Sequence, residues 1–239
     1  MAHQLRAHLR RVGALDSAWH LVIELGVLAG HMLSRERATY ERRFSRRSDP
    51  WDYAGAAARH RHRDALALLD SVLGSKRSGR FEAALEIGCA EGAFTEALSA
   101  RCRSLLAVDF APTALARARR RCAWPGHVSF AEWELKRDVP PAEWGAFDLV
   151  VVMDVLEEGF GPLALRSARD RLVDALRPGG ALLVGNSRQS PVFETSAWGK
   201  ALIRGGRNIN SFFEAHAGLT LRAQRLADGY VLTLLERVA

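Results

Sequence analysis

The chain has 239 residues, of which 48% are hydrophobic, so it can bury one substantial core, and we expect one domain with an appendage. Its net charge of +7 would suit a nucleic-acid partner. However, only three of the 34 basic residues are lysines, and the basic residues are spread along the chain without a dense block that also contains aromatics. We therefore expect no nucleic-acid partner.

Cysteine usage and targeting signals bear on where the protein works. The three cysteines, Cys89, Cys102 and Cys122, lack metal-ligand spacing, and their odd number argues against a disulfide framework. The N-terminus lacks the apolar core and cleavage site of a secretory signal. The apolar stretch 19–33 is shorter than the ~20 residues of a membrane span, and a glutamate and a histidine interrupt it. The sequence predicts a cytoplasmic protein with neither a metal site nor a membrane span.

Residues 1–47 show apolar side chains at helical spacing, flanked by arginines. Three interpretations stay open: a helical cap or dimerisation element that covers core surface, a lid over a substrate pocket, or a helix that lies on a membrane surface. The first would allow a homodimer through these helices. We expect residues 1–50 to form an N-terminal helical cap or lid and residues 51–239 to form the main domain.

Beyond the break at residues 48–53, apolar runs and helical patterns alternate. A helix is predicted over 56–73, followed by a polar linker at 74–79. Strands are predicted near 83–88, 104–110, 127–133, 147–154 and 180–186, and helices near 92–100, 112–123, 163–176 and 208–217. The end of the chain predicts two strands, 219–226 and 230–238, joined by an Asp-Gly turn. This alternation indicates an α/β fold with a mostly parallel sheet.

The turn after the first predicted strand is the most informative feature. It reads Glu86-x-Gly88-x-x-x-Gly92, and glycines at such a turn let the backbone come close to a nucleotide-like ligand. A dinucleotide fingerprint would need glycines at positions 90 and 93, where alanines stand. The ligand class is therefore a different one.

Asp109 ends the second predicted strand, 21 residues after Gly88. A carboxylate there can accept hydrogen bonds from both ribose hydroxyls of an adenosine. The alternative is an N-cap for the helix that follows, and the two roles are compatible. A buried strand with an active-site loop at 147–156 and a helix end, turn and strand at 176–184 follow in order.

Together these segments resemble the class I S-adenosylmethionine-dependent methyltransferases. The resemblance implies a Rossmann-like sheet of seven strands in the order 3-2-1-4-5-7-6 with the last strand antiparallel, and S-adenosyl-L-methionine as cofactor, with S-adenosyl-L-homocysteine as product. Trp133 and Glu134 fall where this fold contacts the adenine, and Asp154 where it approaches the methionine end. Trp51 would stack near the cofactor or cover the pocket; the alternative is simple packing. The residues expected to bind the cofactor are Glu86, Gly88, Cys89, Ala90, Gly92, Asp109, Phe110, Trp133, Glu134, Met153, Asp154 and Trp51.

Three segments, 49–51, 61–66 and 85–96, resemble the rhizobial NodS methyltransferases, and the likeness covers most of residues 49–190. Those enzymes N-methylate the deacetylated glucosamine of nodulation-factor chitooligosaccharides. Where that family has a pair of aromatics, this chain has Glu157 and Glu158. The resemblance implies a NodS-like scaffold that acts on a different small molecule, such as a sugar or secondary metabolite with an amine or hydroxyl acceptor.

Methyl transfer needs mainly placement of the acceptor, and a base only when the acceptor arrives protonated or is a poorly acidic hydroxyl. We name Glu158 and His62 as catalytic candidates, because relatives carry a histidine where Glu158 sits and His62 begins a helix under the pocket. The alternatives are a solvated loop carboxylate and a surface histidine. Candidates for acceptor contact are Glu157, Asn186, Arg188 and Tyr53.

The sequence therefore predicts an S-adenosylmethionine-dependent N- or O-methyltransferase of a small molecule. The alternatives are an RNA or protein methyltransferase and a non-catalytic S-adenosylmethionine-binding domain. After the fourth strand, the chain lacks the Asn/Asp-Pro-Pro-aromatic motif of methyltransferases that act on base amino groups. This difference disfavours a nucleobase substrate.

Overall fold

The protein is described by a computed structural model over residues 36–73, 79–123, 126–141, 144, 147–157, 159–188 and 194–238. The chain divides into two compact units, Met1–Thr39 and Tyr40–Ala239. Of the helical pattern over residues 1–47, the described part is helix α3, Glu36–Arg46. The apolar stretch 19–33 lies outside the described residues, so the cap, lid and dimer roles stay predictions, as does the division at residue 50.

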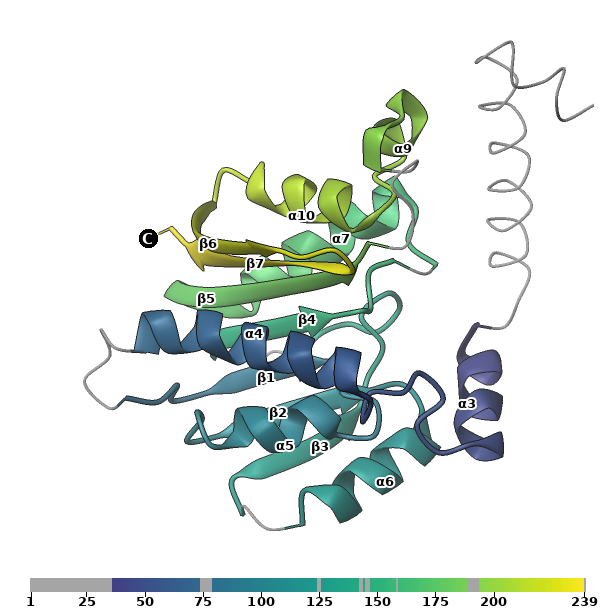
Figure 1. Ribbon diagram of the computed structural model, residues 1–239. Coiled ribbons are helices and arrows are strands. Elements are labelled where there is room, and N and C mark those ends of the chain that lie inside the picture. Colours follow the sequence, from purple (N-terminus) through teal and green to yellow (C-terminus); the bar gives the residue numbers. More distant parts are fainter. Residues whose placement is uncertain are drawn as a thin grey trace, which may run out of the picture. The chain divides into compact units, whose positions relative to one another are not determined.

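The second unit is built on a sheet whose seven described strands follow the order β3-β2-β1-β4-β5-β7-β6 (Figure 1). The strands are β1 (Ala84–Ile87), β2 (Leu105–Asp109), β3 (Val128–Glu132), β4 (Phe147–Met153), β5 (Leu176–Ser187), β6 (Leu219–Leu226) and β7 (Tyr230–Arg237). Strands β1 to β5 pair in parallel, whereas β7 runs antiparallel to both β5 and β6. The predicted strand order and the antiparallel closing strand are confirmed.

Helices cover both faces of the sheet. The helices are α4 (Ala56–Leu73), α5 (Ala93–Ser99), α6 (Pro112–Arg121), α7 (Pro162–Asp174), α9 (Ala197–Ala201) and α10 (Gly206–Glu214). In β4, Leu149 and Val151 pack in the cluster that contains α4 and α5, whereas Val150 and Val152 pack in the cluster that contains α7 and α10. Because side chains of a strand alternate between faces, both faces of β4 are buried. This is why β4 is an unbroken apolar run rather than an alternating pattern.

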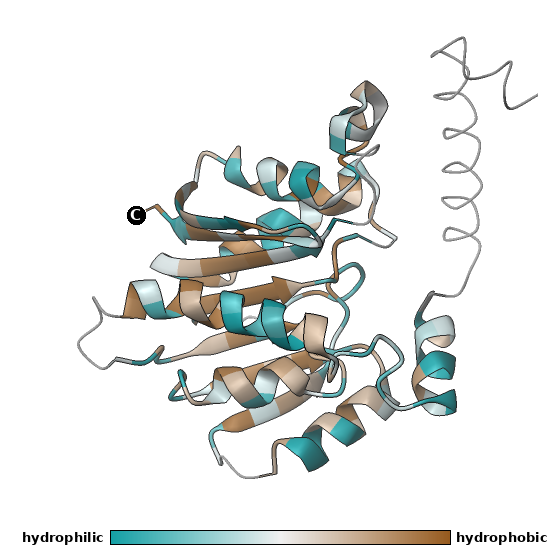
Figure 2. Cartoon of the chain, in the orientation of Figure 1, coloured by the Kyte–Doolittle hydropathy of each residue, from teal (hydrophilic) through white to brown (hydrophobic). Residues whose placement is uncertain are grey.

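The apolar residues concentrate in the strands and on the inner sides of the helices (Figure 2). Burying one leucine, valine or phenylalanine side chain contributes about 1.5–3 kcal/mol. In α4 the buried positions recur every three or four residues, at Ala58, His62, Ala65, Leu69 and Leu73. This spacing aims one stripe of the helix at the sheet and carries His62 inward with the apolar residues.

Two elements differ from the sequence predictions. Strand β5 begins at Leu176 rather than near residue 180, and its pairing with β4 shifts register between Phe147 and Leu149. The expected turn at 178–180 therefore lies inside the strand as an irregularity, with Gly179 at φ +72°. The short helix α9 was not predicted, because five residues are too few for a helical period to show.

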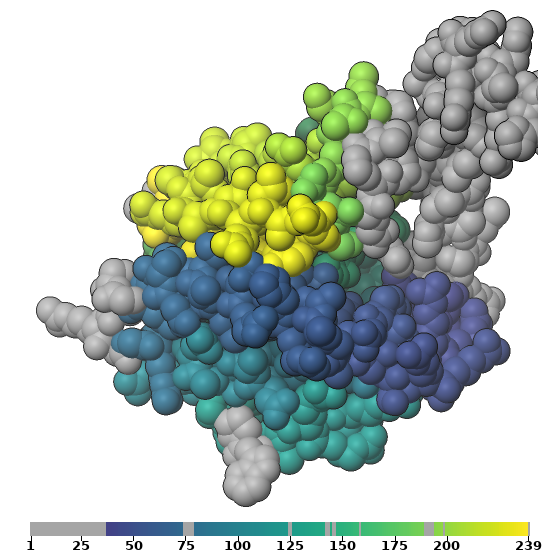
Figure 3. All heavy atoms as spheres, viewed as in Figure 1, coloured from purple at the N-terminus to yellow at the C-terminus, as the bar shows by residue number. Residues whose placement is uncertain are grey.

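Helix α4 is tied to the C-terminal hairpin as well as to the sheet. Asp64 accepts hydrogen bonds from the Tyr230 hydroxyl (2.5 Å) and from Arg225 Nε (2.9 Å). These contacts bring α4 alongside β6 and β7 on one face of the molecule (Figure 3). They also fix the part of α4 that carries Arg61 and His62 at the carboxyl ends of the strands, where doubly wound folds bind ligands.

Candidate cofactor and acceptor site

The loop between β1 and α5 has a backbone that few sequences can adopt. Gly88, Ala90 and Gly92 all have positive φ, at 74°, 46° and 79°. A Cβ on Gly88 would come within 2.3 Å of Val155 Cγ2, and one on Gly92 within 3.1 Å of Ala118. Glycine is thus required at 88 and 92 by both conformation and space.

Asp109 holds this loop from the neighbouring strand. Its Oδ2 accepts a hydrogen bond from the Ala90 N–H and its Oδ1 from the Ala111 N–H, both at 2.9 Å. Burial raises the pKa of Asp109 to about 6, although these backbone amides favour its charged form. The N-cap residue of α6 is Ala111, two positions after Asp109, so the prediction that Asp109 is the N-cap is wrong. A carboxylate has about four lone-pair sites, so Asp109 can still accept a hydrogen bond from a ligand.

A cavity lies where β1, β4, α4 and the glycine loop meet. It contains about 390 Å³ of empty space, part of it open to solvent. Six of the residues expected to bind the cofactor line it: Glu86, Gly88, Cys89, Ala90, Met153 and Asp154. Tyr53 and His62 line it as well. The structure thus gathers residues from four separate segments of the chain.

Two carboxylates that line this cavity each have one oxygen without a hydrogen-bond partner among the described residues. Among the described residues, Glu86 Oε2 and Asp154 Oδ1 are buried without a hydrogen-bond partner. Burial raises the pKa of Glu86 to about 7, against the opposing effect of the nearby Thr95 hydroxyl. A buried polar atom that lacks a partner costs about 1–3 kcal/mol, so these two oxygens are available to accept hydrogen bonds from a ligand or water.

Arg61 is a site residue that the sequence analysis missed. Its Nη2 lies 2.6 Å from Asp154 Oδ2, and both side chains are largely buried. Burial raises the pKa of Asp154 and Arg61 opposes that rise. Arg61 Nε has no hydrogen-bond partner among the described residues. The signal was present, because Arg61 precedes His62 in one of the segments that resemble NodS.

His62 and Tyr53 lie in the cavity as neutral groups. Burial, helped by the charge of Arg61, lowers the pKa of His62 to about 4, and its ring packs 5.0 Å from that of Phe94. Burial and the charge of Asp154 raise the pKa of the Tyr53 hydroxyl. At neutral pH both side chains can shape the cavity and form hydrogen bonds without carrying charge.

Aromatic side chains cover the loop beside the cavity. Trp51 stacks on Tyr40 (5.5 Å between ring centroids) and on Tyr53 (6.3 Å), and Phe110 meets Tyr40 edge-on at 5.4 Å. Trp51 and Phe110 pack in the same cluster as Ala90. The predicted cover by Trp51 and its predicted packing are therefore both compatible with this arrangement.

Trp133 and Glu134 follow β3 and are not among the residues that line the cavity. Trp133 is buried, with its ring 4.9 Å from that of Trp144. Glu134 lies 3.3 Å from Arg137 Nε, and its N–H donates to Asp138. The adenine contact assigned to this pair stays a prediction.

The residues expected on the acceptor side are mostly engaged with other parts of the fold. Glu157 accepts hydrogen bonds from the Ser187 N–H and from the Ser187 hydroxyl, the latter at 2.7 Å, and burial raises its pKa to about 7. Glu158 lies outside the described residues.

Asn186 and Arg188 are not among the residues that line the cavity. Asn186 is fully buried and donates to Asn210 Oδ1 (2.7 Å). Arg188 pairs with the buried Glu194 (3.1 Å) and donates to the Ala227 carbonyl. The structure does not bring either side chain to the lining of the cavity, which is a departure from the expected acceptor constellation.

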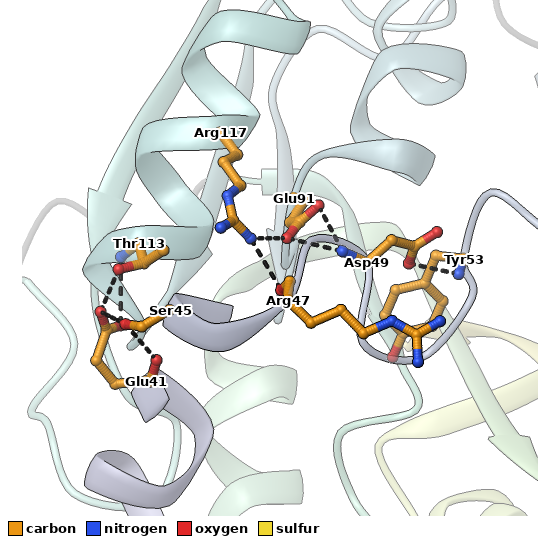
Figure 4. A network of polar contacts seen from close by, with 8 residues as sticks. All are labelled: Glu41, Ser45, Arg47, Asp49, Tyr53, Glu91, Thr113 and Arg117. Atoms are coloured by element: carbon orange, nitrogen blue, oxygen red, sulfur yellow. Dashed lines mark hydrogen bonds and ion pairs between the residues drawn. The ribbon is translucent and has the colours of Figure 1, made fainter. Parts of the chain in front are cut away.

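A polar network ties the segment before α4 to the glycine loop and to α6 (Figure 4). Glu91 accepts from the Asp49 N–H with both oxygens (3.0 and 3.1 Å) and from Arg117 Nη1 (2.5 Å). Glu41 accepts from the N–H and the hydroxyl of Thr113. Glu91 is a second residue that the sequence analysis missed, although a charged residue in a glycine loop was a visible signal.

Metal sites and membrane spans were also sought. Within the described ranges, no group of three or more histidine, cysteine or carboxylate side chains could hold a metal ion. None of the helices in those ranges is long and apolar enough to cross a membrane.

The arrangement can now be compared with known proteins. A family model described as Nodulation protein S (NodS) matches residues 34–216. The chain belongs to the NodS family. The solved structure of the N-methyltransferase NodS from Bradyrhizobium japonicum WM9, in complex with S-adenosyl-L-homocysteine, is 29% identical and superposes with a TM-score of 0.69. That match covers 85% of this chain and 99% of the other. The predicted family resemblance and the class I methyltransferase fold are confirmed.

Curated relatives agree with this assignment. Nodulation protein S of Rhizobium tropici is 38% identical over 144 residues, which are 59% of this chain and 56% of that protein. Nodulation protein S of Sinorhizobium fredii (strain NBRC 101917 / NGR234) is 34% identical over 158 residues, which are 66% of this chain and 65% of that protein. The matches thus span less than two thirds of the length of these NodS relatives.

Proposed function

We propose that the chain is an S-adenosyl-L-methionine-dependent methyltransferase that methylates an amine or hydroxyl of a small molecule. Membership of the NodS family supports this proposal. So does the similarity to a solved NodS that is described as an N-methyltransferase in complex with S-adenosyl-L-homocysteine. A sugar or secondary metabolite is the acceptor class that we favour, because the chain belongs to the NodS family. The two glutamates that stand in place of that family's aromatic pair favour an acceptor different from that of the namesake enzymes.

The observation that carries the proposal is the set of polar groups around the cavity. Glu86 Oε2 and Asp154 Oδ1 are buried acceptors without a partner among the described residues, and Arg61 offers a guanidinium beside Asp154. An ammonium group needs acceptors of this kind and a carboxylate needs a donor such as Arg61. The cavity therefore fits the amino-acid end of S-adenosylmethionine.

The remaining cofactor contacts follow from the loop geometry. We propose that Asp109 accepts both ribose hydroxyls and that the backbone of the loop from Gly88 to Gly92 approaches the ligand, next to Cys89 and Ala90. Phe110 and Trp51 would flank the adenosine, and Met153 would lie under the reacting end. Trp133 and Glu134 remain our proposal for the adenine contact.

When bound, S-adenosylmethionine supplies a methyl group that its sulfonium has already activated. The chain's residues then have to position the acceptor and exclude water. Because the pKa of Glu157 is raised to about 7 by burial, this carboxylate can take a proton from an ammonium acceptor near neutral pH. His62, whose pKa burial lowers to about 4, is a weaker base, and we assign it to shaping the cavity. Glu158 stays a candidate base.

The test is calorimetric titration of the protein with S-adenosyl-L-homocysteine, followed by an assay for its formation from S-adenosylmethionine with a panel of aminosugars, sugar nucleotides and phenols. We expect binding to the wild type, a marked loss of affinity for Arg61→Gln, and turnover with one acceptor class. The surface variant Arg103→Gln, which alters only an exposed pair with Glu82, is the matched control. Binding without turnover on any acceptor would favour a non-catalytic S-adenosylmethionine sensor, and no binding would refute the proposal.

Two finer proposals concern the setting of the enzyme. The three cysteines are buried free thiols, which is usual in a reducing compartment and supports a cytoplasmic location. The N-terminal helical segment is proposed as a cap, a lid or a homodimer contact. Sedimentation of the full chain and of a chain that starts at residue 36 would distinguish the dimer from the other two roles.

A further inference from the structure

Glu91 lies in the glycine loop and makes contacts that cofactor binding does not explain. Its side chain is 9% exposed and forms an ion pair with Arg117. Both its oxygens accept the Asp49 N–H, at 3.0 and 3.1 Å. Arg117 also donates to the Arg47 carbonyl (3.1 Å), so the backbone on both sides of Ser48 is fastened to the loop and to α6 (Figure 4). Hydrogen bonds to charged groups are stronger than those between neutral groups, so these contacts hold the segment firmly.

The side chain of Asp49 in turn fixes the backbone of Tyr53. Its φ of 46° is in the left-handed region, which an aspartate adopts when its carboxylate bonds locally. Here Oδ1 accepts the Tyr53 N–H (2.7 Å) and Oδ2 the Ala54 N–H (2.8 Å). The turn 49–54 is thereby closed by one side chain, and the position of Asp49 sets the position of Tyr53.

Tyr53 is the end of this chain of contacts and lies in the cavity. It lines the cavity together with Asp154, and the charges of Asp154 and Arg61 both act on its hydroxyl. Its ring also stacks against that of Trp51. A shift of the 49–54 turn would therefore move a wall of the cavity, even though Glu91 itself is not among the residues that line it.

We infer that Glu91 is a positioning residue, which acts on the ligand in the cavity through Asp49 and Tyr53. The inference rests on the proposed function, because it takes the cavity to be the S-adenosylmethionine site. In this arrangement the Asp49-Pro50-Trp51 segment connects the glycine loop to Tyr53 and thereby positions Tyr53 at the reacting end of the site. It also explains why a glutamate stands in a loop whose backbone needs only small residues.

The test is a double-mutant cycle on affinity for S-adenosyl-L-homocysteine, measured by calorimetry on the full chain. Glu91→Ala should weaken binding about tenfold in the wild-type background and less than about twofold in a Tyr53→Ala background, because residues that act through one another are not additive. Thr113→Val is the matched control. It removes the hydroxyl contact with Glu41, which also joins the segment before Asp49 to α6, but it leaves Glu91 untouched.

Thr113→Val should change affinity less than about twofold in either background, and thermal unfolding of every variant verifies that it folds. If Glu91→Ala does not fold, Arg117→Gln replaces it, with a smaller expected loss of about threefold that again disappears in the Tyr53→Ala background. Equal losses in the two backgrounds, or no loss at all, would overturn the inference alone. Failure of the wild type to bind S-adenosyl-L-homocysteine would overturn the proposed function and this inference with it.

Discussion

The two sides of the site are built differently. On the side of β1 and β2, Asp109 bonds to backbone N–H groups of its own loop and of the glycine loop, while Glu86 keeps an oxygen free toward the cavity. On the side of β5, the Asn186 amide nitrogen donates to Asn210 while its buried Oδ1 has no partner among the described residues, and Arg188 pairs with Glu194. On the first side, backbone N–H groups fix the carboxylate that holds the glycine loop. On the second side, polar side chains bond to Asn210 of α10 and to Glu194.

This contrast explains why one half of the site is easier to interpret than the other. A glycine loop binds through its backbone, so its sequence must satisfy φ angles and close approaches that only a few residues allow. Polar side chains at strand ends can form hydrogen bonds with several neighbouring groups in the fold. Their positions in the sequence do not show which of these hydrogen bonds forms. The following experiments test whether the difference between the two sides is real.

Replacing Gly88 should have the largest effect. Gly88→Ala places a Cβ 2.3 Å from Val155 Cγ2 at a φ of +74°. Left-handed strain costs about 1–2 kcal/mol and overpacking about 1–3 kcal/mol, so we expect a loss of about 2–5 kcal/mol in the free energy of unfolding, together with loss of S-adenosyl-L-homocysteine binding. Denaturant unfolding and calorimetry measure both. Gly229→Ala is the control, because its Cβ meets nothing within 4 Å. Similar behaviour of the two variants would contradict the steric argument.

Glu86 should make stability fall as the pH rises. Burial raises its pKa from 4.5 to about 7, so between these values the folded protein binds a proton that the unfolded chain has released. The stabilisation is complete below about pH 4.5 and is lost as the pH rises through about 7, a change of about 3 kcal/mol. Glu86→Gln should remove this part of the pH dependence. Unfolding by urea from about pH 4.5 to 8 tests it, and parallel profiles for the two proteins would show that Glu86 titrates normally.

Asp109 should matter for ligand binding as well as for the glycine loop that it holds. Asp109→Ala removes the acceptor for the ribose hydroxyls and should cost about 1.5–3 kcal/mol in affinity for S-adenosyl-L-homocysteine. Asp70→Ala serves as control, since Asp70 pairs with Arg101 at the surface. Equal affinity of Asp109→Ala and wild type in calorimetry would rule out the ribose contact.

Asn186 should show the smallest effect, and on stability alone. Asn186→Ala breaks its hydrogen bond to Asn210 and should lower the free energy of unfolding by about 1–2 kcal/mol without changing cofactor affinity or turnover. Thr233→Val, which removes another contact of Asn210, should behave alike. A loss of turnover with unchanged stability would instead place Asn186 at the acceptor, as the sequence analysis expected.

Much of the fold could be predicted because its signals are local. Buried strands such as β4 are unbroken apolar runs, and the glycine loop with Asp109 marks the ends of β1 and β2. The start of β5 and helix α9 could not be predicted. The start of β5 depends on a register shift in its pairing with β4. Helix α9 is too short for apolar residues to recur at helical spacing.

The sequence by itself determined the strand order and the family, because apolar runs mark the strands and a backbone that needs positive φ and close approaches at residues 88 and 92 admits few residue types. The tertiary structure decided which polar side chains meet. It placed Arg61 against Asp154 and joined Glu91 to Asp49, and it buried Asn186 against Asn210. Such pairs form between residues far apart in the chain, and their energies depend on burial and geometry that appear only when the helices pack on the sheet.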